Sequence, residues 1–219
     1  MRATHVIIAA LVLCPWQALG QTSGAPPASG LSEPPTAREP EEWSLFASAY
    51  GYAVPDGGNY LQPTFTADRG WLHLQARYNY EDLETGSAWL GCNFSGGGTL
   101  AWEITPMVGG VFGSTAGAAF GYIGSLSWRR IELVSEGEYV TVAADSSDNF
   151  TYAWSELTLR PLDGLRFGLA LQNTWVGGED DAEPGVLLGL SFKNVDLAAY
   201  LFNPSESDRT IVAAVSLEF

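Results

Sequence analysis

The stretch that decides the fold runs from Trp71 to Glu81 and reads WLHLQARYNYE. Every second position holds an apolar or aromatic side chain: Leu72, Leu74, Ala76, Tyr78 and Tyr80. The positions between them hold polar side chains: His73, Gln75, Arg77, Asn79 and Glu81. A period of two places these sets on opposite faces of a β-strand, whereas a helix would mix them. The stretch therefore predicts a strand with one apolar and one polar face.

The same alternation recurs from Trp43 to the last residue. It defines about twelve segments, at residues 43–54, 58–67, 70–82, 85–95, 98–113, 116–129, 130–143, 149–160, 164–177, 184–193, 194–202 and 208–219. Tight connections alternate with looser ones, several of them strongly acidic, which is typical of a transmembrane β-barrel. We predict an all-β, antiparallel up-and-down barrel over residues 43–219. It has about twelve strands, with ten as the alternative if one hairpin is miscounted.

Composition and charge exclude two classes of protein. The 219 residues include 25 acidic and 10 basic side chains, for a formal net charge of -15. So few cations cannot build a basic face for nucleic acid. The longest apolar run lies near the N-terminus and is too short to cross a membrane as a helix. We therefore expect neither a nucleic-acid partner nor a helical membrane protein.

The first 42 residues do not share the strand pattern. Arg2, the apolar run at 6–13 and the small-x-small sequence Ala18-Leu19-Gly20 predict a secretory signal peptide over residues 1–20. Residues 21–42 are rich in proline and almost free of apolar side chains, which predicts a disordered periplasmic linker. It is either a plain spacer or a tether for a partner.

The C-terminal segment resembles a known signal. Ile211, Ala213, Val215 and Leu217 alternate with a second set, Thr210, Val212, Ala214, Ser216 and Glu218, and the chain ends on Phe219. This pattern is similar to the last strand of bacterial outer-membrane β-barrel proteins, which the barrel-assembly machinery recognises. The resemblance implies a Gram-negative outer membrane, with lipid and lipopolysaccharide around the barrel. It implies a class of protein and no particular activity.

The aromatic residues and prolines give further expectations. One interfacial girdle is expected at the periplasmic strand ends and another near the outer ends, carried by Trp43, Trp71, Trp102, Trp128 and Phe219 and by Trp175 respectively. Pro63 and Pro106 fall inside strands, where we expect local bulges. Residues 44–52 fit either register, since Phe46, Tyr50 and Tyr52 compete with Leu45, Ala47 and Ala49 for the lipid face.

Charged side chains are expected to line the lumen, because an Arg or Lys on the lipid face costs roughly 2–4 kcal/mol at the midplane. The inward set is His73, Arg77, Glu103, Glu132, Glu136, Glu138, Glu156, Arg160, Arg166 and Lys193. Symmetric pairing of the hairpin around residues 144–149 places Glu136 near Glu156 and Glu132 near Arg160, and Arg166 then lies near Arg160. A close carboxylate pair can bind a cation or share a proton, or it is one part of an ion-pair ladder that fills the lumen.

The sequence gives little support to an enzyme. Outer-membrane barrel hydrolases use a histidine base, and His73 is the sole histidine of residues 21–219, with no serine near it in the strand pattern. No cluster of metal ligands stands out, so we expect no catalytic residue, metal or cofactor. The acidic run at 179–183 is read as a solvated loop.

The leading expectation is a passive channel for small polar solutes with an acid-biased lumen that favours cations. The alternative is a structural or interaction protein with a filled lumen and a partner-docking linker. A hydrolase embedded in the barrel comes third.

Overall fold

The computed structural model describes residues 42–54, 58–205 and 209–219. The predicted signal peptide and nearly all of the predicted linker lie outside these residues. The strands are β1 (Ser44–Val54), β2 (Gly58–Arg69), β3 (Leu72–Tyr78), β4 (Thr85–Cys92), β5 (Phe94–Gly97), β6 (Leu100–Gly113), β7 (Gly117–Trp128), β8 (Ile131–Val142), β9 (Phe150–Leu162), β10 (Leu165–Val176), β11 (Glu179–Phe192), β12 (Val195–Phe202) and β13 (Thr210–Glu218).

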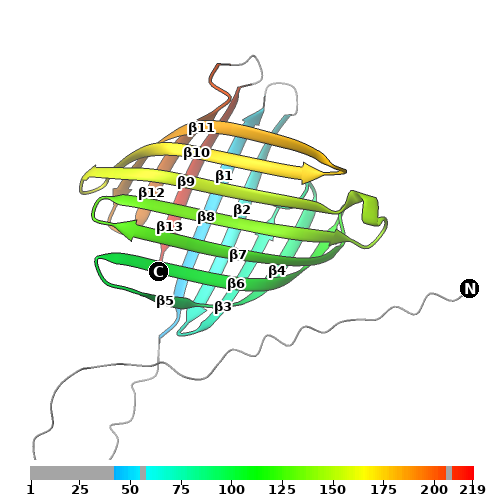
Figure 1. The fold of residues 1–219 in the computed structure, drawn as a ribbon, viewed down its shortest axis with the longest axis horizontal. Helices are drawn as coiled ribbons and strands as arrows, with labels where there is room; N and C mark the ends of the chain where they lie inside the picture. Colours follow the sequence, from blue (N-terminus) through cyan, green and yellow to red (C-terminus); the bar gives the residue numbers. More distant parts are fainter. Residues whose placement is uncertain (1–41, 55–57, 206–208) are drawn as a thin grey trace, which may run out of the picture. The chain divides into compact units, whose positions relative to one another are not determined.

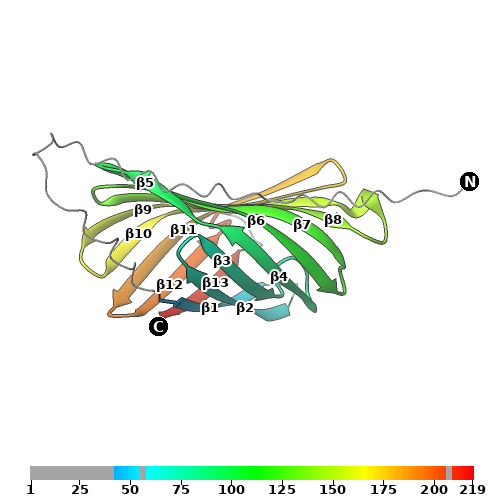
Figure 2. The same cartoon turned by 90° about the horizontal axis from the view of Figure 1, so that it is seen from below.

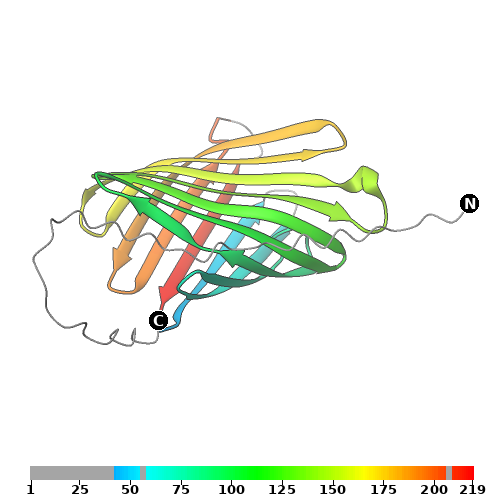
Figure 3. The same cartoon turned by 60° about the horizontal axis from the view of Figure 1, so that its bottom comes forward.

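These strands form one closed antiparallel sheet (Figure 1). Each strand except β4 pairs with the next along the chain, β4 pairs with β6, and β1 pairs with β13. In Figures 1 and 3 the strands β6 to β11 form one wall of the barrel, and β1, β2, β12 and β13 cross behind them at a steep angle. The prediction of an all-β, up-and-down barrel is confirmed.

The prediction of about twelve strands is also confirmed, because β5 continues β4. Gly91 pairs with Met107 and Phe94 pairs with Ile104, so the register against β6 is the same on both sides of the break. The break lies opposite Pro106, which has no N–H to donate to the ladder. Figure 2 shows β5 at one end of the barrel. Among the described strands it pairs with β6 alone.

The bulges expected at the two prolines are not formed. Pro106 stays in register with Tyr122, and Pro63 stays in register with Ala49. The β2–β3 ladder starts at Thr64, immediately after Pro63, so the proline lies where β2 has no pairing with β3. A register shift occurs instead between Leu165 and Phe167, where β10 meets β9.

The register of β1 resolves the ambiguity at its start. Tyr52 is 5% exposed and packs inside the barrel together with Tyr50 and Val54. The alanines at 47, 49 and 53 therefore lie on the outer face of the strand. Phe46 has the same parity as the two tyrosines but is 37% exposed, close to the end of the barrel.

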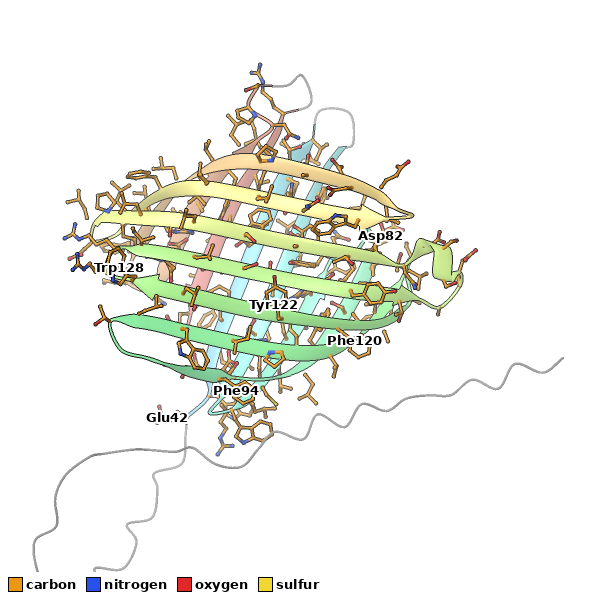
Figure 4. All side chains as sticks on the ribbon, in the orientation of Figure 1. Glu42, Asp82, Phe94, Phe120, Tyr122 and Trp128 are labelled. Atoms are coloured by element: carbon orange, nitrogen blue, oxygen red, sulfur yellow. The ribbon has the colours of Figure 1, made fainter. Side chains whose placement is uncertain are left out.

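The outer surface is a broad apolar belt with aromatic rings at its two rims. The rings expected at the short-turn end, Trp43, Trp71, Trp102, Trp128 and Phe219, are all exposed, and so is Trp175 at the long-loop end. Figure 4 shows Phe120 and Tyr122 on β7 between the rims, with Trp128 at one end of the barrel and Asp82 at the other. Aliphatic side chains are also exposed between the rims, among them Leu90, Leu169 and Leu188.

No helix within the described residues is long and apolar enough to span a membrane.

The two faces of β10 give a direct test of this arrangement. Leu169 is 60% exposed on the outer belt, so Leu169→Arg is expected to cost about 2–4 kcal/mol in a bilayer and to reduce the folded fraction strongly. Thr174→Arg on the inward face of the same strand faces acidic side chains and should fold normally. The folded fraction in liposomes is measured by heat-modifiable mobility on gels. Equal folding of both variants would contradict the face assignment.

Candidate functional site: the barrel lumen

Two clusters of apolar and aromatic side chains fill parts of the barrel interior, beside buried polar and charged groups. One cluster gathers around Tyr52, Trp154, Tyr200 and Phe202, and a second around Trp89 and Val140. Tyr200, Phe202 and Val140 are at most 2% exposed. The lumen therefore contains packed regions comparable with a protein core, in addition to its charged groups.

An aromatic bridge crosses the lumen from β1 to β9 and β12. Tyr50 on β1 meets the Trp154 ring edge-on at 6.0 Å between centroids, and Trp154 meets Tyr200 edge-on at 5.2 Å. Four strands separate β1 from β9 in the sheet, so these contacts span the interior. Glu156 accepts hydrogen bonds from Trp154 Nε1 at 2.9 Å and from the Tyr200 hydroxyl at 2.8 Å, and Arg166 pairs with the same carboxylate at 3.0 Å.

A second bridge joins β3 to β8 and is built on Arg77. This guanidinium is 5% exposed and donates to Glu138 at 2.9 Å, with Glu136 at 3.8 Å. Its carbon atom Cζ lies 4.0 Å from the centre of the Tyr80 ring and 4.9 Å from that of Trp89. Carboxylates and ring faces together hold the buried cation, a combination that offsets its lost hydration.

Tyr80 is on the other side of the wall from where the alternation predicts it. The regular strand β3 ends at Tyr78, and Asn79 adopts a left-handed backbone conformation with φ of 57°. This change of direction turns residues 80 and 81 inward. The Tyr80 hydroxyl donates to Glu136 at 2.5 Å, and Glu81 accepts from Ser87 Oγ at 2.5 Å and from Trp89 Nε1 at 3.3 Å. The expectation that Tyr80 faces lipid was wrong.

A cavity of about 1010 Å³ lies above these bridges, at the long-loop end. Rings of Tyr52, Tyr60, Tyr80, Phe150 and Tyr152 line it, and Tyr52 stacks on Tyr60 at 4.5 Å. Its acidic lining residues come from three loops or hairpins: Glu81, Asp82, Asp148, Asp181 and Glu183. None of the described residues that line this cavity is a lysine, an arginine or a histidine. We name it the outer vestibule.

The acidic run at 179–183 was expected in a loop but belongs to β11. Gly177 and Gly178, with φ of 60° and 88°, form a two-residue turn, and Glu179 pairs directly with Val176. Such turns favour glycine because both central residues need positive φ. The hairpin thus extends further than predicted, and its strand geometry directs Asp181 and Glu183 into the vestibule.

The loop between β8 and β9 brings Asp148 to the vestibule through a short 3-10 turn, Ser146–Asp148. Asp145 caps this turn by accepting a hydrogen bond from the Ser147 backbone N–H at 2.9 Å. That bond holds the pKa of the exposed Asp145 carboxyl below its ordinary value. The turn also makes the β8–β9 hairpin asymmetric, and this changes which residues of β8 and β9 pair with each other.

This asymmetry shifts the expected carboxylate pair. Glu136 pairs with Trp154 in the sheet and Glu156 with Val134, so the two carboxylates are diagonal neighbours and not direct partners. Each carboxylate faces a different arginine, Arg77 or Arg166. The predicted close pair Glu136–Glu156 was therefore wrong.

The predicted contact between Glu132 and Arg160 is formed, at 2.7 Å. Arg160 N–H donates to the Arg130 carbonyl, and its long side chain reaches diagonally to Glu132. The second arginine expected there is elsewhere, because Arg166 binds Glu156 and Asp196. The predicted arginine pair facing Glu132 was wrong.

The other predicted inward residues lie toward the short-turn end. His73 is 4% exposed, and its Nδ1 lies 2.7 Å from Asp68 Oδ1, which also accepts from Asn93 at 2.7 Å. Glu103 has inward parity but is exposed near the end of β6. Lys193 does not face the lumen: it is exposed in the β11–β12 turn, 5.5 Å from the Phe192 ring centre.

The sequence reasoning missed the aromatic bridge and the vestibule acids. A signal for the bridge was present in β9, because the parity that turns Glu156 inward also turns Tyr152 and Trp154 inward. The vestibule depends on loop geometry, which alternation does not encode. Within the described residues no group of three or more His, Cys, Asp or Glu side chains is arranged to hold a metal ion.

No protein-family model matches the chain, and no curated protein sequence matches it. Solved structures do. The KdgM porin superposes with a TM-score of 0.59 at 10% identity, over 80% of this chain and 99% of that one. The KdgM porin in complex with disordered oligogalacturonate gives 0.57 at 9% identity, over 80% and 98%.

A larger barrel, OccD3 (OpdP) of Pseudomonas aeruginosa, gives 0.48 at 12% identity, over 84% of this chain and 66% of that one. At such identities the likeness to the KdgM porin concerns the fold. The chain has the closed β-barrel architecture of the bacterial outer-membrane porins.

The buried Arg77 bridge and the exposed Glu132–Arg160 pair are expected to contribute very different amounts to the free energy of unfolding. Arg77→Ala leaves Glu138 buried without its cation and is expected to cost about 3–5 kcal/mol of unfolding free energy. The Arg160 side chain is 46% exposed, so Arg160→Ala should cost less than about 1 kcal/mol. Urea unfolding of both variants in the same liposomes measures this difference. Equal losses would show that Arg77 is not the central buried cation.

Proposed function

We propose that this protein is an outer-membrane channel that conducts small polar solutes and prefers cations. The observation that carries the proposal is the outer vestibule, a cavity of about 1010 Å³ inside a porin-like barrel, with five acidic residues and no basic one among its described lining residues. A concave site lined by one sign of charge concentrates counter-ions at its entrance. The likeness in fold to porins supports a channel.

The same features support an orientation for the protein in the outer membrane. The outer belt is apolar between two aromatic rims, so we infer that it contacts lipid and, at the long-loop end, lipopolysaccharide. The short turns and the described ends of the chain, Glu42 and Phe219, then face the periplasm, and so does the N-terminal linker. The last strand ending at Phe219 is the segment that we expect the barrel-assembly machinery to recognise.

The acidic vestibule argues against one type of solute. One solved KdgM porin holds disordered oligogalacturonate, a chain of sugar carboxylates. Entry of such an anion here would place it beside Glu81, Asp82, Asp148, Asp181 and Glu183, and the like charges would repel it. The negative charge of the vestibule therefore favours cations and neutral solutes over anions as the conducted solutes.

A second function is favoured by the two bridges. Side chains from opposite walls meet at Tyr50, Trp154 and Tyr200 and again at Arg77 and Glu138. A lumen bridged at these points is narrow, and a structural or interaction protein with a filled lumen would be built in the same way. His73 and Asp68 form a hydrogen-bonded pair, and His73 Nε2 has no hydrogen-bond partner among the described residues, so no nucleophile is attached to this ring there.

Ion selectivity in planar bilayers tests the proposal. We expect a reversal potential in a KCl gradient that favours K⁺ over Cl⁻. Asp148→Asn with Asp181→Asn should reduce the K⁺/Cl⁻ permeability ratio by about twofold, because both carboxylates are exposed and act through a screened field. Asp163→Asn in the β9–β10 turn, at the opposite end, is the matched control and should change little. Anion preference, or an unchanged ratio in the double variant, would contradict the acidic filter.

The bridges give a separate prediction that decides between channel and filled barrel. Trp154→Ala removes the ring that joins Tyr50 to Tyr200, and we expect conductance to rise severalfold over a small but measurable value for the unaltered protein. Folding of the variant is checked by heat-modifiable mobility. A folded, unaltered barrel without conductance would favour the structural function.

A further inference from the structure

We propose that the outer vestibule is a binding site for organic cations, small molecules that carry ammonium or guanidinium groups. This inference rests on the proposed channel function and names the solute class. Three observations carry it. A buried carboxylate in the vestibule has an oxygen without a hydrogen-bond partner, and aromatic rings line the same cavity. Deeper in the lumen, carboxylates and aromatic rings already hold the Arg77 guanidinium.

Glu81 is the first of these observations. It lines the vestibule and is 9% exposed. Its Oε1 accepts hydrogen bonds from Ser87 and Trp89, whereas its Oε2 is buried and has no hydrogen-bond partner among the described residues. An unsatisfied buried carboxylate oxygen is costly. This oxygen is shielded from solvent in the described structure, so a cationic N–H donor in the vestibule would satisfy it by displacing the groups that cover it.

The other acidic residues and the aromatic rings surround a space that is large enough for a small organic molecule. Among the described residues, Asp82 accepts hydrogen bonds from two neutral donors, the Leu83 N–H and the Thr115 hydroxyl. Tyr52 and Tyr60 stack with 7° between their planes, so their ring faces form a flat apolar surface. A volume of about 1010 Å³ is at the upper end of sites for drug-sized molecules and far exceeds a bare ion.

Arg77 shows how this lumen binds a cation. Its guanidinium contacts Glu138 and lies beside the faces of Tyr80 and Trp89. The vestibule offers the same groups, carboxylates and tyrosine faces, and none of its described lining residues is basic. Aromatic faces attract organic cations by their quadrupole, whereas a strongly hydrated metal ion gains less from them. Organic amines and guanidines therefore fit better than Mg²⁺ or Ca²⁺.

The experiment uses spermidine as the organic cation. Mg²⁺ is the control, because it carries charge but no hydrocarbon that could contact the rings. K⁺ current through the folded protein is recorded while each is added at the long-loop side. Spermidine should block at lower concentration than Mg²⁺. Glu81→Gln with Asp181→Asn should raise the half-blocking spermidine concentration by about tenfold. Asp163→Asn should leave it unchanged. Tyr60→Leu should raise it by about threefold for spermidine and leave Mg²⁺ block unaffected.

Calorimetric titration of the same folded protein in detergent separates this inference from the channel proposal. Current without preferential spermidine block, or block that the double variant does not weaken, overturns the organic-cation site and leaves the channel. Spermidine binding that the double variant weakens, in a barrel without current, supports the site and overturns the channel. Neither current nor binding by a folded barrel overturns both.

Discussion

Closure of the backbone hydrogen-bond network is the constraint on which this structure depends. In hydrocarbon an unpaired N–H or C=O costs several kcal/mol, so a spanning sheet must have no free edge. Pairing of β1 with β13 and of β4 with β6 meets that requirement. Closure also fixes the parity of every strand, because alternate side chains must point to lipid or to the lumen. The apolar belt, the buried charges and the vestibule all follow from that division.

Inside the barrel a second constraint operates, because charges withdrawn from bulk water need partners. Arg77 satisfies it with Glu138, Glu136 and the Tyr80 ring, and Arg166 satisfies it with Glu156 and Asp196. The Arg77–Glu138 and Arg166–Asp196 contacts join strands that are not neighbours in the sheet, so they also hold the walls of the barrel together. Above them the charge balance changes, since the outer vestibule has acidic lining residues and no basic one among those described. The buried ion pairs support the structure, and the acidic vestibule is where a solute is expected to bind.

The sequence predicted what depends on alternation and missed what depends on loops and on packing across the lumen. The run from Leu72 to Tyr78 was assigned correctly because a polar side chain on the outer face is costly. Tyr80 was misplaced because Asn79 leaves the extended conformation. The Glu136–Glu156 contact was misplaced because the 3-10 turn at Ser146–Asp148 makes the hairpin asymmetric. Tyr52 and Trp154 face inward although they are aromatic, and hydropathy cannot distinguish a ring that faces lipid from one that crosses a narrow lumen.

The division between lipid face and lumen is tested most directly with the tryptophans themselves. Trp175 is 40% exposed on the outer rim, whereas Trp154 is 6% exposed inside the barrel. Two variants that each retain one of these tryptophans are folded into liposomes with lipids brominated on their acyl chains, and fluorescence quenching is recorded. The structure predicts strong quenching of Trp175 and little quenching of Trp154. Equal quenching of both would mean that Trp154 faces lipid, and the assignment of the lumen would be wrong.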